Sequence, residues 1–212
     1  GNGGKVGAVR AALSSTFVSS EFRENEAGPG GTGGTDCQPP LFADGGVGGH
    51  GGAMWAGTQV RLVDSVVASN VAGSGGHSMG LEPGPGGDGG GVSAPVVSLE
   101  RTAVLGNRAG SAAAVPDCWW SNVGRAGRGG GVFSTQSADI VTSTLADNEA
   151  GTGGDRPNCV GGIGGDGGAV FGRDISLRFA TVVRNRSGRG YPCDDEFFDW
   201  RVEPGDGAAL IA

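Results

Sequence analysis

The sequence has few of the bulky residues that fill an ordinary globular core. Among its 212 residues there are only one tyrosine, eight phenylalanines and four tryptophans. Lys5 is the only lysine, and no run of eighteen apolar residues occurs, which predicts that the chain has no membrane span. No charged and then apolar leader opens the chain, so we take Gly1 as the start of a mature or trimmed chain.

Acidic residues outnumber basic ones, and glycine is far more abundant than in an average protein. The net charge of −7 argues against nucleic acid as a partner, because the phosphate backbone attracts basic surfaces. The chain has 47 glycines and 10 prolines, a composition that without periodicity indicates disorder. The glycines must therefore belong to a repeat if the chain is folded.

A repeat is found when the sequence is aligned on five asparagines. An apolar residue stands eight positions before each of them, another stands three positions before, and a glycine with a small and an apolar residue introduces each copy. The asparagines are Asn25, Asn70, Asn107, Asn148 and Asn185. We predict a single domain over residues 1–212, with repeats of about 7–51, 52–89, 90–129, 130–167 and 168–206 and a partial copy at 207–212.

The spacing within each repeat predicts short strands. Alternating apolar residues such as Val60 and Leu62, or Val97 and Leu99, have the period of a strand, and each copy can bury its apolar side only against its neighbours. The sequence therefore predicts an all-β fold, a right-handed parallel β-helix (solenoid) of about five coils. Asparagine tolerates left-handed backbone angles, so we expect the five asparagines to stack at one bend as a structural ladder without a catalytic role.

The glycine-rich segments between the strands have a period of three. Segments 45–52 and 161–168 carry glycine at two of every three positions, which is typical of an extended helix of the polyproline or polyglycine II type. We expect each excursion to be an out-and-back pair, stacked as a second layer against one face of the β-helix. Flexible glycine loops are the alternative.

Four cysteines stand in polar, loop-like surroundings. They are Cys37, Cys118, Cys159 and Cys193, none forms a C-x-x-C pair, and a zinc site is therefore not expected. Their even number predicts disulfides and an oxidising, extracellular location. The pairing Cys159–Cys193 with Cys37–Cys118 is favoured over Cys118–Cys159, and reduced thiols are the alternative.

No catalytic, metal or cofactor site is predicted. Calcium at Asp166 or Asp88 is the alternative, because residues 161–166 match the start of a calcium-binding nonapeptide. Gly168, however, stands where that motif needs a large apolar residue, and Arg128 occupies the equivalent position of another repeat. Aromatic residues such as Trp55 could form a carbohydrate-stacking platform, but small loop cores are the more ordinary explanation.

Two motifs resemble a known family. Gly52-Ala53-Met54 and Gly168-Ala169-Val170, each after another glycine, are similar to the G-G-A-[ILV] element of chlamydial polymorphic outer-membrane proteins, and residues 22–25 match their F-x-x-N. The pattern covers about half of the chain and resembles the passenger repeats of bacterial surface proteins. The resemblance implies display on a bacterial surface and a role in adhesion or as a scaffold.

The ends of the repeat array suggest self-association. Residues 1–6 are too short for a cap and residues 207–212 form a bare apolar strand, so Leu210 and Ile211 are expected to make an end-to-end contact. We predict a non-enzymatic, extracellular fibre or filament subunit, whose partner is another copy of itself, head to tail, with an adhesive role toward carbohydrate or a host surface. A piece of a larger adhesin, or a polysaccharide-binding or polysaccharide-degrading protein (a lyase or glycoside hydrolase), is the alternative.

Overall fold

The computed structural model describes residues 1–33, 44–78, 82–114, 124–154, 162–190, 205–207 and 210–211. These residues contain β-strands and no helix, and the strands form two parallel sheets, one of nine strands and one of five. The nine-stranded sheet contains β1 (Val9–Ala11), β2 (Ser14–Val18), β4 (Met54–Ala56), β5 (Gln59–Val63), β7 (Val92–Glu100), β9 (Val132–Val141), β11 (Val170–Phe171), β12 (Asp174–Arg178) and β14 (Leu210–Ile211). The five-stranded sheet contains β3 (Glu21–Arg23), β6 (Val66–Ala68), β8 (Ala103–Leu105), β10 (Thr144–Ala146) and β13 (Thr181–Val183).

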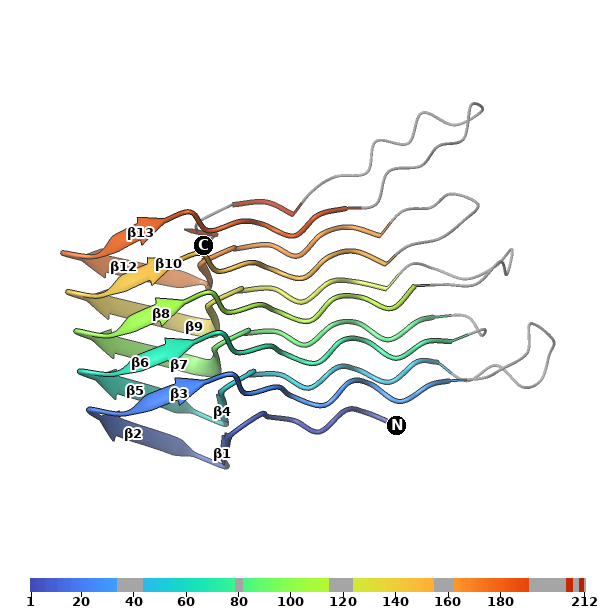
Figure 1. Ribbon diagram of the computed structural model, residues 1–212, viewed down its shortest axis with the longest axis horizontal. Helices are drawn as coiled ribbons and strands as arrows, with labels where there is room; N and C mark the ends of the chain where they lie inside the picture. Colours follow the sequence, from blue (N-terminus) through green and yellow to red (C-terminus); the bar gives the residue numbers. More distant parts are fainter. Residues whose placement is uncertain are drawn as a thin grey trace.

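Each sequence repeat forms one layer of the structure. Layer 1 holds β1 to β3, layer 2 holds β4 to β6, layer 3 holds β7 and β8, layer 4 holds β9 and β10, and layer 5 holds β11 to β13. Equivalent residues pair in parallel register from layer to layer, as in Met54 with Val92 and Val92 with Val132. Figure 1 shows the strands stacked one above another. Residues that share a position in successive layers are called a column below.

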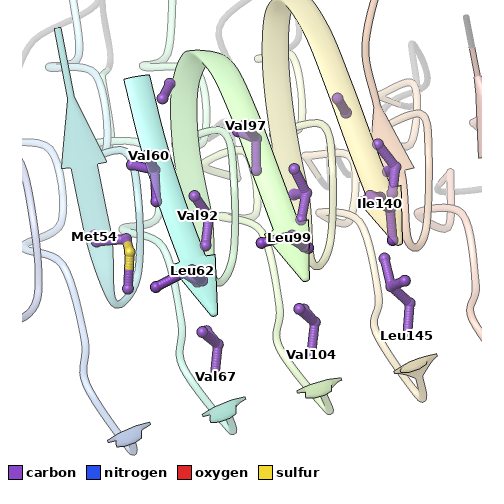
Figure 2. Close-up of a cluster of buried hydrophobic side chains, with 14 of the residues drawn as sticks. Met54, Val60, Leu62, Val67, Val92, Val97, Leu99, Val104, Ile140 and Leu145 are labelled. Carbon is purple, nitrogen blue, oxygen red and sulfur yellow. The ribbon is translucent and has the colours of Figure 1, made fainter. Parts of the chain in front are cut away.

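The apolar columns of the repeat form the core between the two sheets. Leu62, Leu99 and Ile140 point inward from the nine-stranded sheet, and all three are fully buried. They face a column of the five-stranded sheet that includes Val67 and Leu145, which are also fully buried (Figure 2). Each such side chain contributes about 1.5–3 kcal/mol through its burial. The two positions found from the sequence, eight and three residues before each asparagine, are therefore the core positions.

Two columns of left-handed residues bend each layer. The first lies between the two sheets and the second directly precedes each asparagine, with φ between 46° and 58° in both columns. Their members are Ser19, Asp64, Arg101, Thr142 and Phe179, and then Glu24, Ser69, Gly106, Asp147 and Arg184. The expectation that the asparagines themselves take the left-handed conformation is wrong. The preceding residue makes the bend, which leaves the asparagine free to turn its side chain inward.

The prediction of a right-handed parallel β-helix is wrong. Within the described residues the structure consists of two parallel sheets, and no closed solenoid is seen. As far as the structure describes them, the glycine-rich parts of the repeats contain no strand. Glycine favours strands poorly, and its missing side chain lets the backbone bond to neighbours on several sides instead of in one ladder.

The glycine-rich segments lie beside the sheets and not against one face of them. Figure 1 shows them running away from the strands as stacked pairs. We call 26–33, 71–78, 108–114, 149–154 and 186–190 the outgoing segments, and 44–52, 82–90, 124–130 and 162–168 the return segments. Residues 1–7 take the place of a return segment in layer 1 and bond to the return segment of layer 2.

Hydrogen bonds give these segments a period of three. The amides of Gly45, Gly48 and Gly51 donate to carbonyl groups of the next return segment at 2.9–3.0 Å. The amides of Gly46 and Gly49 donate to the outgoing segment of the same repeat, at 2.8 and 2.9 Å. Bonds to each neighbour recur every third residue, which is the period of an extended helix with three residues per turn. Return segments are thus parallel to one another and antiparallel to outgoing segments.

One row of glycines runs through the whole stack. Each amide donates to the carbonyl of the preceding member at 2.8–3.1 Å, in the order Gly4, Gly28, Gly49, Gly73, Gly87, Gly110, Gly127, Gly151, Gly165, Gly188 and Gly205. A Cβ at Gly127 would lie 2.1 Å from the Gly87 carbonyl oxygen, and the other interior members meet similar contacts. The close approach of the backbones therefore requires glycine at these positions.

Candidate functional site

The five predicted asparagines form one continuous hydrogen-bonded row. In each of the first four, the backbone amide and the side-chain amide both donate to Oδ1 of the next asparagine, at 2.8–3.0 Å. The side-chain amide also donates to a strand carbonyl of the preceding layer, for example from Asn107 to Val67. Asn70, Asn107 and Asn148 are fully buried. Their polar atoms are used inside the stack, so this row holds the layers together and offers no surface to a ligand.

A surface groove follows the return segments across the layers. It consists of two adjoining cavities of about 260 and 340 Å³, which share Val47 and His50. The lining comes from outward positions spaced three residues apart, because the intervening residues bond to the neighbouring segments. Those positions form two columns, Val47, Pro85, Arg125 and Ile163, and then Lys5, His50, Asp88, Arg128 and Asp166.

Side chains in the second of these columns accept hydrogen bonds from the backbone of the next layer. Nδ1 of His50 accepts the Asp88 amide at 2.9 Å, and Oδ1 of Asp88 accepts the Arg128 amide at 2.8 Å. Oδ1 of Asp166 accepts the Asp206 amide at 2.9 Å. The two aspartates considered for calcium therefore support the stacking of layers. Within the described residues no group of three His, Cys, Asp or Glu side chains is placed to hold a metal ion.

Aromatic rings border the groove where the return segments enter the nine-stranded sheet. Trp55, Ser93, Phe133 and Phe171 pair in register from layer 2 to layer 5. The rings of Phe133 and Phe171 stack with their centroids 5.5 Å apart. The Arg128 guanidinium lies 4.6 Å from the Phe171 centroid and 5.0 Å from that of Phe133.

Two cations of the groove, Lys5 and Arg125, and Arg10 beside it have no carboxylate partner among the described residues. Lys5 and Arg10 lie over the Trp55 ring at 5.8 and 5.7 Å from its centroid, and neither forms an ion pair. Arg125 likewise forms no ion pair there, whereas Arg128 contacts Asp88 at 3.4 Å. Among the described residues, the lining thus has two cations without an ion pair, Lys5 and Arg125, against one such carboxylate, Asp166, beside a partly exposed indole ring. This excess of positive charge suits an anionic ligand with apolar faces.

Two ion pairs between layers lie at the two columns of left-handed bends. Arg184 donates two hydrogen bonds of 2.7 Å to Asp147, and Arg101 donates to Asp64 at 2.6 and 3.0 Å. The hydrogen bonds from Arg184 lower the pKa of Asp147, and those from Arg101 lower the pKa of Asp64. These pairs are exposed, so each contributes little to stability.

The remaining predicted residues are placed as follows. Cys37, Cys118, Cys159 and Cys193 lie outside the described residues, so the disulfide predictions stay predictions. Leu210 and Ile211 form β14, which pairs with Val170 and Phe171 of β11, and Leu210 packs against the core. In the described part of the chain no helix is long and apolar enough to cross a membrane.

The described structure defines a class of protein, a repeat protein whose parallel sheets continue into stacked glycine-rich extended segments. No family model, curated protein or solved structure matches the chain. The resemblance to bacterial surface repeats therefore stays a prediction. The groove was not predicted from the sequence, although two features of the sequence indicate it. Side chains other than glycine recur at every third position of the return segments, and Trp55, Phe133 and Phe171 directly follow the aligned apolar residues.

Proposed function

We propose that this protein is an adhesive structural module of an extracellular bacterial surface fibre, which lengthens when copies stack end to end. The observation that carries the proposal is the match between the side chains of layer 1 and those of layer 5. Among the described residues, β2 and β3 each pair with one strand only, and so do β12 and β13. Such open edges recruit strands of the same register.

Opposite charges in shared columns support this stacking. Arg184 occupies the column that holds Asp147 in layer 4 and Glu24 in layer 1. Arg186 occupies the column that holds Glu149 in layer 4 and Glu26 in layer 1. A second copy placed in register on layer 5 brings an acid over each arginine, and for Arg184 this repeats its ion pair with Asp147 inside the molecule.

The asparagine row supports the same register. Within the described residues, Oδ1 of Asn25 accepts no hydrogen bond and the backbone amide of Asn185 donates none. Every interior step of the row joins one such donor to one such acceptor. In-register stacking supplies the missing partners, with Asn185 donating to Asn25 of the next copy.

The strand β14 competes with this contact. Leu210 pairs with Val170 at one end of the stack, and Val9 occupies the same column at the other end, where it pairs with Met54. The first strand of an incoming copy therefore needs the place that β14 holds. A variant that lacks residues 207–212 is expected to assemble at a lower concentration than the full chain.

A charge exchange between the two ends tests the proposal. Glu24 and Arg184 lie four layers apart, about 19 Å at one strand spacing per layer, so they cannot pair within one copy. Glu24→Arg and Arg184→Glu should each reduce assembly in sedimentation velocity and electron microscopy, and an equimolar mixture or the double variant should restore it. Thermal melting of each variant checks the fold. The proposal would be contradicted if the full and the shortened chain both stayed monomeric at all concentrations. It would also be contradicted if the charge exchange did not change assembly.

Binding to a polysaccharide is the second candidate function. The groove beside Trp55, with unpaired Lys5 and Arg125, favours it over degradation. Its experiment is given in the next subsection.

A further inference from the structure

We infer that the groove along the return segments binds an acidic polysaccharide, whose chain lies along the stack and crosses the layers. This inference names a ligand for the adhesive role proposed above, but it rests on the groove alone and does not require assembly.

The shape of the groove points to an elongated ligand. Its two cavities adjoin through Val47 and His50, and the lining extends from Lys5 in layer 1 to Asp166 in layer 5. Neighbouring layers are about 4.8 Å apart, so the lining spans roughly 19 Å along the axis. A site that repeats one backbone arrangement in every layer suits a polymer that repeats along its own length.

The charges point to carboxylate or sulfate groups on that polymer. Lys5, Arg10 and Arg125 carry positive charges that no carboxylate of the described residues neutralises. An unpaired guanidinium at the surface is a ready partner for a planar carboxylate, to which it can donate two parallel hydrogen bonds. Lys5 and Arg10 lie at the Trp55 ring, and Arg125 lies three layers away from Lys5. This spacing suits anionic groups that are spaced along a chain.

The uncharged lining points to sugar and not to a simple anion. Trp55 is partly exposed between the cations Lys5 and Arg10, and Ile163 is 58% exposed. Nδ1 of His50 accepts the Asp88 amide, which places the ring proton on Nε2, where it can be donated to a hydroxyl group. Indole faces pack against the apolar C–H faces of sugar rings, while the polar tips around them bind hydroxyl groups.

The experiment measures binding of defined polymers to the Glu24→Arg variant, in which end-to-end stacking is blocked. The probes are polygalacturonate, neutral dextran and double-stranded DNA, titrated by calorimetry at low and high salt. Polygalacturonate should bind, dextran should bind much more weakly, and binding should weaken as salt rises. Glycan binding is measured on this variant and assembly on the native chain, so loss of glycan binding and loss of assembly are separate results.

Substitutions in the groove locate the site. Arg125→Gln and Lys5→Gln should each weaken polygalacturonate binding about fivefold, and Trp55→Ala should weaken it about tenfold. Arg61→Gln is the matched control, because it removes the same charge from β5, where Arg61 pairs with Glu100 outside both cavities. Equal binding of dextran or DNA, no binding of polygalacturonate, or equal effects of Arg61→Gln and Arg125→Gln would overturn the inference.

Discussion

The side-chain amide of Asn107 donates to Oδ1 of Asn148 at 3.0 Å, across 41 positions of sequence. Both side chains are fully buried, and each repeats the same pair of bonds to the next layer. A buried amide that is satisfied on every side holds the two layers in a single register, because a slip of one residue would leave its polar atoms unpaired.

Replacement of Asn107 by alanine should therefore be strongly destabilising. It removes the acceptor of the Asn70 amides and the donor to Val67, so buried groups are left without partners. We expect a loss of about 3 kcal/mol or more in the free energy of unfolding, measured by urea denaturation. Asn25→Ala, at the partly exposed end of the row, is the control and should cost less. Equal losses at the two positions would contradict this account of the row.

The glycine row predicts a sharp contrast between two similar substitutions. Gly127→Ala places a methyl group 2.1 Å from the Gly87 carbonyl oxygen, and the backbone there cannot yield without breaking the row. Gly4→Ala, in the same row, meets no atom closer than 3.9 Å. Gly127→Ala should cost about 3 kcal/mol, the upper end of the usual range for overpacked sites, and Gly4→Ala should be close to neutral. Thermal melting compares the two, and a similar melting temperature for both would refute the packing.

Two carboxylates should make the stability fall in acid. Arg101 and Arg184 lower the pKa of Asp64 and Asp147 below the ordinary value of 3.8. A carboxylate whose pKa is lower in the folded state stabilises the fold above the unfolded value, and this contribution is lost as the pH falls through the folded value. The stability should therefore drop below about pH 3.8, whereas near neutral pH the contribution of these pairs is fully present and does not change with pH.

The measurement is the urea midpoint at pH 7 and at pH 3 for the native chain and for the double variant Arg101→Gln with Arg184→Gln. The native chain should lose more stability between the two pH values than the variant does. The control for the loss of a positive charge is Arg125→Gln, because Arg125 forms no ion pair among the described residues. An unchanged pH dependence in the double variant would show that these pairs do not carry the effect.

The cysteines predict a mass difference. If the four cysteines form two disulfides, alkylation without reduction adds no mass to the protein. After reduction, all four cysteines react and the mass increases by four alkyl groups. Peptide mapping of the oxidised protein should then recover Cys159 linked to Cys193 and Cys37 linked to Cys118. A linked Cys118–Cys159 peptide would support the rival pairing, and full alkylation without reduction would contradict both the disulfides and the extracellular assignment.

The sequence by itself determined the repeat and its core. The residues eight and three positions before each asparagine, such as Leu99 and Val104, are the core residues, fully buried in the three middle layers and partly buried in the first and fifth. Apolar side chains with strand period can be buried only between stacked copies. The period of three in the glycines likewise predicted the extended, out-and-back course of those segments, with flexible loops as the alternative. Both features depend on the spacing between residues that are close in the sequence, so they can be read from the sequence directly.

The tertiary structure decided how these parts are combined. The sequence predicted a closed helix of strands covered by a second layer. In the structure, the glycine segments lie beside two separate sheets and bond to one another through the row that includes Gly87 and Gly127. The left-handed bends at residues such as Thr142 and Phe179 could not be predicted from the sequence, because neither residue type favours that conformation. The groove was hidden for a related reason. Its side chains come from all the layers, and only the register of the backbone hydrogen bonds brings them into one line.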